Sequence, residues 1–60
     1  MREMEVAAYA RQLFDQYGAK AIAMAAQRVR SSQEKGDDED ASKWRRIETA
    51  LTELRGPRET

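Results

Sequence analysis

Residues Gly36 to Ile47 read GDDEDASKWRRI and carry the clearest structural signals of this chain. A glycine just past a helix accepts the left-handed backbone conformation that closes the helix, so Gly36 predicts a helix end. Asp37 or Asp38 then supplies a carboxylate that accepts an orphaned backbone N–H at the start of the next helix. Further acidic residues follow in the first turn, where negative charge meets the positive end of the helix dipole. The stretch therefore predicts a boundary between two helices.

The helix that follows, over about residues 38–55, is amphipathic. Its apolar side chains recur at spacings of three and four residues, which places them on one helix face. This face consists of Trp44, Ile47, Leu51 and Leu54, with Ala41 and Ala50 beside them. Glu39 and Lys43 are four residues apart in the favourable order for an ion pair. We expect Trp44, the only tryptophan, to be the largest single contributor to the core.

Gly18 ends an earlier helical segment, over about residues 3–17. Its apolar stripe recurs at spacings of four, three and four residues. The stripe consists of Val6, Ala10, Leu13 and Tyr17, flanked by Tyr9 and Phe14. We expect both tyrosines to pack with their hydroxyls at the rim of the core.

A segment rich in alanine, over about residues 19–35, lies between the two glycines. Its stripe is thinner and consists of Ile22, Ala26 and Val29, with Ala19 and Ala25 beside it. Met24 falls on the opposite side, among Lys20, Gln27 and Ser31. The last turns, over residues 30–35, are polar and are candidates for fraying.

These patterns predict an all-α fold: a small three-helix bundle, or a helical hairpin with a third helix, with breaks near Gly18 and Gly36. At Gly18 the first two helices could pack antiparallel across a short turn, or the joint could be a kink in one long helix. Because the two stripes are only approximately in phase, we favour a true break. We expect one helical domain over residues 1–56 and a flexible C-terminal tail over residues 57–60, because Gly56 and Pro57 stop the last helix.

The composition argues against several classes of function. The chain has 60 residues and contains neither cysteine nor histidine, so it lacks thiolate ligands and the commonest general base near neutral pH. The acidic run at residues 37–40 lacks the spaced ligands and central glycine of a calcium loop. We therefore expect no metal, no cofactor and no catalytic residues, and we expect that the protein is not an enzyme.

Charge and hydropathy indicate which classes of partner, nucleic acid or membrane, the chain could bind. Eleven basic residues balance 11 acidic ones, whereas a dedicated nucleic-acid binder usually carries a basic surplus. The longest apolar run, over residues 21–26, is far too short to span a bilayer, and the N-terminus is charged where a signal peptide would become apolar. We therefore expect a cytoplasmic protein that does not bind a membrane, and we favour a protein partner over a nucleic acid.

Three functional hypotheses remain open. The first is a small interaction or regulatory module that forms a homodimer or docks on a larger protein, since so small a core benefits from a partner. Its contact surface would consist of Lys20, Met24, Gln27 and Ser31. The second is an accessory nucleic-acid-binding protein that uses Arg28, Lys43, Arg45 and Arg46, although Arg45 and Arg46 point about 100° apart on a helix. The third is an inhibitor of a larger complex, encoded by a mobile element.

The segment after Gly36 resembles a group of short, uncharacterised bacterial helical proteins. The shared pattern is a Gly-Asp step, an alanine, Trp-Arg-Arg-Ile and an ending similar to Ala-Ile-x-x-Leu. The matching residues are Gly36, Asp37, Ala41, Trp44, Arg45, Arg46, Ile47, Ala50 and Leu54, and Leu51 stands where the pattern has isoleucine. Upstream, Ala10-Arg11 and Tyr17-Gly18 are also similar, so the resemblance covers most of the chain. It implies a helical structure and assigns no activity.

Overall fold

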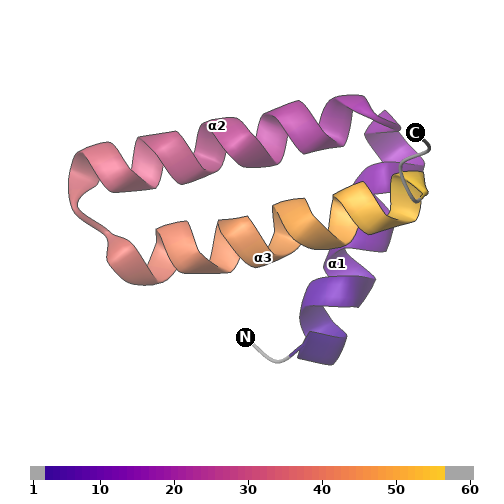
Figure 1. Cartoon of the computed structure of the whole chain (residues 1–60), viewed down its shortest axis with the longest axis horizontal. Coiled ribbons are helices and arrows are strands. Elements are labelled where there is room, and N and C mark those ends of the chain that lie inside the picture. Colours follow the sequence, from indigo (N-terminus) through magenta and orange to yellow (C-terminus); the bar gives the residue numbers. More distant parts are fainter. Residues whose placement is uncertain (1–2, 57–60) are drawn as a thin grey trace.

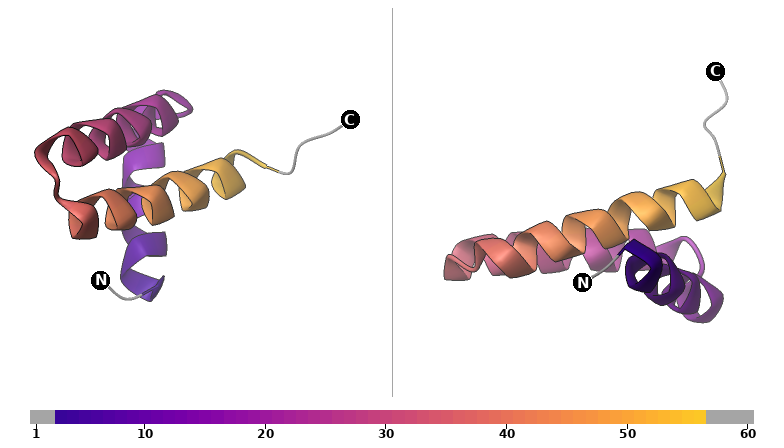
Figure 2. Two further views of the ribbon diagram at one scale, coloured as in Figure 1. Left: turned by 60° about the vertical axis from the view of Figure 1, so that its left-hand side comes forward. Right: turned by 90° about the horizontal axis from the view of Figure 1, so that it is seen from below.

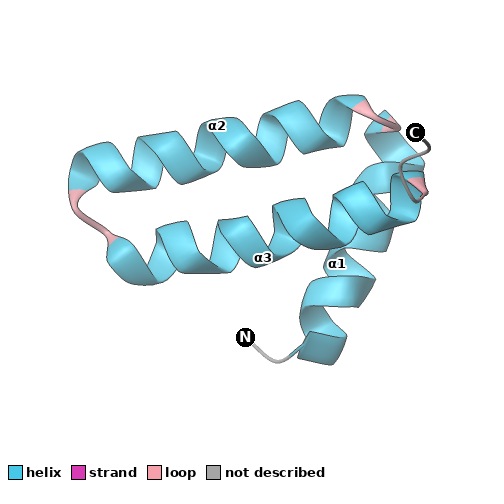
Figure 3. Cartoon of the chain, viewed as in Figure 1, coloured by secondary structure: helices cyan, strands magenta, loops and turns pink. Residues whose placement is uncertain are grey.

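The computed structural model describes residues 3–56, and these residues form three α-helices. The helices are α1 (Glu3–Tyr17), α2 (Lys20–Lys35) and α3 (Asp38–Arg55). Within residues 3–56 only short loops separate the helices, and no strand is present (Figure 3). The predicted all-α fold is confirmed, with its breaks at Gly18 and Gly36.

The arrangement is a helical hairpin crossed by a third helix. Helices α2 and α3 run antiparallel, and α1 passes across them at a steep angle (Figure 1). The left view of Figure 2 shows the first turns of α1 projecting beyond the hairpin. The chain therefore makes a true turn at Gly18. Antiparallel packing of α1 on α2, one of the two arrangements considered at this joint, is not found, because α1 crosses the hairpin at a steep angle.

Glycine closes α1 and α2 in two different ways. Gly36 has φ 78°, its N–H donates to the carbonyl of Gln33 at 3.0 Å, and the N–H of Asp37 donates to the carbonyl of Ser32 at 2.9 Å. This pair of bonds is a Schellman motif. Gly18 has φ 63° and makes a single closing bond, from its N–H to the carbonyl of Phe14 at 2.7 Å. Helix α3 ends at Arg55, and Pro57, the predicted stop, lies outside the described residues.

The core is centred on the predicted face of α3. Ile47 and Leu51 are completely buried and Trp44 is 8% exposed, so this part of the prediction is confirmed. From α1, Val6 and Ala10 are buried, and Leu13 and Phe14 pack against the core. Tyr17 was expected in the same stripe but is 45% exposed, because it lies in the last turn of α1, beside the Gly18 turn.

Helix α2 presents a different face to the core from the one its larger apolar residues suggest. Its buried side chains are Ala21, Ala25 and Ser32, whereas Ile22 and Val29 are only partly buried. Small side chains at the closest approach let two helices pack with their backbones near each other, and the bulkier residues then lie at the edge of the contact. At its polar end, the candidate for fraying, α2 continues as a helix to Lys35 with Ser32 buried inside it.

Candidate functional site

Polar side chains join the ends of α2 and α3 beside the Gly36 turn. Asp37 is the N-cap of α3, and its Oδ1 accepts from the N–H of Asp40 at 3.1 Å. The buried hydroxyl of Ser32 donates to Oδ2 of Asp40 at 2.5 Å, across the turn. Lys43 completes the group, because its Nζ lies 3.1 Å from Oδ1 of Asp40. We call these four residues the hairpin clasp.

Two details of the clasp differ from the sequence-based interpretation. Lys43 pairs with Asp40, three residues earlier, rather than with Glu39. The bond from Ser32, followed by the bond from Lys43, lowers the pKa of the Asp40 carboxyl below its ordinary value of 3.8, and the positive charges of Lys43 and Arg28 act in the same direction. Partial burial opposes the shift. A carboxylate held ionised in this way is a hydrogen-bond acceptor that stabilises the turn.

Trp44 is surrounded by side chains from all three helices. The ring of Tyr9, on α1, meets it edge-on with centroids 5.9 Å apart and an interplanar angle of 67°. The guanidinium of Arg28, on α2, lies 5.2 Å from the ring centroid, and Nζ of Lys43 lies 5.9 Å from it. Such contacts between cations and aromatic rings are favourable. Arg28 therefore packs over the ring of Trp44 while the residue as a whole stays exposed.

The structure does not bring the four basic residues of the nucleic-acid hypothesis together at one site, although Lys43 and Arg46 both line a hollow beside the start of α3. Arg28 and Lys43 both lie over Trp44, and the ring itself is largely shielded from solvent. Arg45 and Arg46 instead line a groove between α1 and α3. Only the second pair is placed to meet a ligand in that groove.

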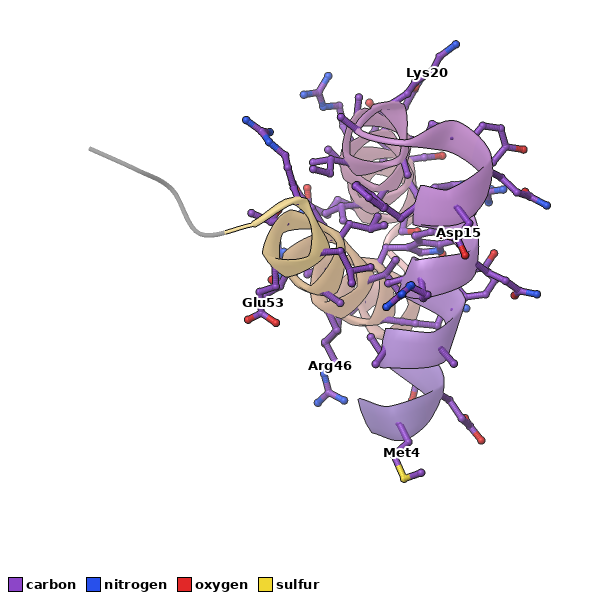
Figure 4. The ribbon with its side chains drawn as sticks, turned by 90° about the vertical axis from the view of Figure 1, so that its right-hand side faces the viewer. Met4, Asp15, Lys20, Arg46 and Glu53 are labelled. Atoms are coloured by element: carbon purple, nitrogen blue, oxygen red, sulfur yellow. The ribbon has the colours of Figure 1, made fainter. Side chains whose placement is uncertain are left out.

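The residues of the interaction hypothesis lie together on one exposed face of α2. Lys20, Met24, Gln27 and Ser31 are all exposed, and we call them the α2 surface. Met24 is 36% exposed, although it is a large apolar side chain. It lies one turn before Arg28 and so borders the surroundings of Trp44. Figure 4 shows Lys20 projecting outward, away from α1 and α3.

The groove between α1 and α3 was not anticipated from the sequence. It has a volume of about 500 Å³, and we call it the α1–α3 groove. Its lining consists of Val6 and Ala7 from α1 and of Ser42, Arg45, Arg46, Thr49, Ala50 and Glu53 from α3. These α3 residues recur at helical spacing, which is a signal of a shared face, but the sequence does not show that α1 crosses beside them.

The described residues give no sign of a metal centre or a membrane span. Within residues 3–56, no group of three or more acidic side chains is placed to hold a metal ion. None of the three helices in this range combines the length and hydropathy needed to cross a bilayer. Comparison with protein-family models gives no match, and comparisons with curated proteins and with solved structures give no significant match.

Proposed function

We propose that this protein is a small, non-enzymatic cytoplasmic interaction module that binds a protein partner through the α2 surface. The observation that supports this most directly is Met24, a large apolar side chain that stays 36% exposed on α2. Methionine is adaptable and is favoured at protein-contact surfaces.

The composition of the α2 surface fits this role. One apolar side chain is surrounded by Lys20, Gln27 and Ser31, which are exposed and polar. An apolar centre with a polar rim is the usual organisation of a protein interface. Because the patch occupies one face of a short helix, it supports a small interface, which is typical of transient complexes.

Affinity purification of the tagged protein from its native cell tests the proposal. In Met24→Glu, a charge replaces the apolar centre, and we expect recovery of the partner to fall about tenfold or more, since burying an unpaired charge is costly. Circular dichroism should show an intact helical fold, because Met24 is not part of the core.

Gln12→Glu is the matched control, because it adds the same charge at an exposed position in the middle of α1. We expect this variant to recover the partner at the level of the unchanged protein. Equal recovery of the same proteins by the Met24→Glu variant would contradict the proposal.

A further inference from the structure

The α1–α3 groove is lined by three charged side chains, Arg45, Arg46 and Glu53, and two of opposite sign, Arg46 and Glu53, are too far apart to pair with each other. Arg46 and Glu53 both line it and lie seven residues apart on α3. Seven residues are two helical turns, or roughly 10 Å along the axis, which is too far for an ion pair. Neither Arg46 nor Glu53 forms an ion pair with another side chain of the described residues. Figure 4 shows both side chains projecting from α3 on the side away from α2.

This spacing is complementary to itself. Suppose that two copies of α3 lie antiparallel about a two-fold axis. A residue that precedes the axis in one copy then faces the residue of the other copy that follows the axis at the same distance. The midpoint between Arg46 and Glu53 lies between Thr49 and Ala50. With the axis there, Arg46 of each copy faces Glu53 of the partner subunit, and both charges of both copies are paired.

We propose that the α1–α3 groove is the interface of a homodimer, in which a second copy of this chain packs its α3 antiparallel against the first. The lining supports close approach, because Thr49 and Ala50 at the centre are small and small side chains let helix axes come near each other. Val6, Ala7 and Ala50 supply apolar surface. Met4, which is 83% exposed on the projecting first turns of α1, adds apolar surface near the groove (Figure 4).

The charge pairs set the register of the dimer, since complementary charges select partners and orientation more than they add affinity. The dimer does not rest on the α2 surface, which lies on another helix and stays open to a different partner.

Sedimentation equilibrium over a wide concentration range tests this inference with two charge reversals. In R46E, the introduced carboxylate faces Glu53 of the partner subunit, and in E53R, the introduced guanidinium faces Arg46 of the partner subunit. We expect each variant alone to associate at least about tenfold more weakly, since like charges oppose each other twice in the dimer. Each monomer should melt as the unchanged protein does, because neither side chain forms an ion pair within residues 3–56 of its own chain.

Mixing the variants distinguishes pairing from a general effect of charge. In a one-to-one mixture of R46E and E53R, every reversed charge faces an opposite one, so we expect heterodimers with near-normal affinity. The double variant R46E/E53R should recover homodimers for the same reason. Arg30→Glu, an equal reversal at an exposed position on α2, should leave association unchanged, and so should Met24→Glu.

Several results would overturn the inference. The unchanged protein could remain monomeric at every concentration, or the single reversals could associate as tightly as it does. The mixture could also associate no better than either variant alone. Binding of a labelled single-stranded oligonucleotide at low salt, lost in R46E while the protein stays monomeric, would instead assign the groove to a nucleic acid.

Discussion

The two joints between helices are built very differently. At the α2–α3 joint, Gly36 closes α2 with a Schellman motif, Asp37 caps α3, and Ser32 reaches across the turn to Asp40. At the α1–α2 joint, one bond from the N–H of Gly18 closes α1, and Ala19 stands at the N-cap of α2 without a side-chain hydrogen bond.

The difference shows how each part of the molecule is held. The hairpin of α2 and α3 is specified by local hydrogen bonds that the chain carries on both sides of its turn. Helix α1 has no such anchor, and its place depends on packing Val6, Ala10 and their neighbours against the core. Local opening should therefore begin at α1, because the element with the fewest local constraints opens at the lowest free energy.

We expect the largest loss of stability when Trp44 is removed, because both the hairpin and α1 pack against its ring. Trp44 meets Tyr9 from α1 and Arg28 from α2, so Trp44→Ala should lower the free energy of unfolding by about 3–5 kcal/mol and unfold much of so small a domain. Urea or thermal melts followed by circular dichroism measure this loss. Trp44→Phe, which keeps an aromatic ring, should lose less. If Trp44→Ala melted close to the unchanged protein, the conclusion that Trp44 is a main part of the core would be contradicted.

The second test compares the joints directly through Gly18→Ala and Gly36→Ala. Both glycines have positive φ, and an added Cβ would meet no atom within 4 Å at either site, so the cost is backbone strain of about 1–2 kcal/mol. We expect the larger loss at Gly36, where strain also disturbs the bond from Asp37 and the cap that follows. Urea unfolding gives the two losses. An equal or larger loss of unfolding free energy in Gly18→Ala would contradict the conclusion that local hydrogen bonds hold the α2–α3 joint more firmly.

The smallest expected effect is a loss of folding stability at acidic pH, where Asp40 becomes protonated. The folded pKa of Asp40 lies below 3.8, so as the pH falls below that value the unfolded chain takes up the proton first, and this part of the stability disappears. Ser32→Ala removes the largest cause of the shift. Its deficit in unfolding free energy relative to the unchanged protein should be present at neutral pH and should shrink as the pH falls through and below 3.8.

Ser31→Ala is the control for this titration, because Ser31 is the exposed neighbour of buried Ser32. We expect it to follow the unchanged protein at every pH in a series of thermal melts. A deficit of Ser32→Ala that stays constant down to strongly acidic pH would show that the carboxylate of Asp40 is not what the hydroxyl stabilises.

Much of the helix pattern could be predicted, and much of the candidate site could not. The bounds of α3 and most of its buried face follow from short-range rules and are confirmed, and of the two predicted caps, Asp37 and Asp38, the structure uses Asp37. The buried face of α2 was misjudged, because a stripe of larger residues at Ile22 and Val29 was weighted above the alanines. The role of Ser32 was missed because its partner, Asp40, lies eight residues away, across the Gly36 turn.

The positions where the helices begin and end follow from the sequence, because caps, glycine turns and apolar periodicity act over a few residues. Helical spacing alone also brings Met24 and its neighbours onto one face of α2. The crossing of α1 over the hairpin, the contact of Arg28 with Trp44, and the groove that Arg46 and Glu53 share with Val6 and Ala7 depend instead on the tertiary fold. Those contacts depend on which helix faces meet, and that choice is made by the packing of all three helices together.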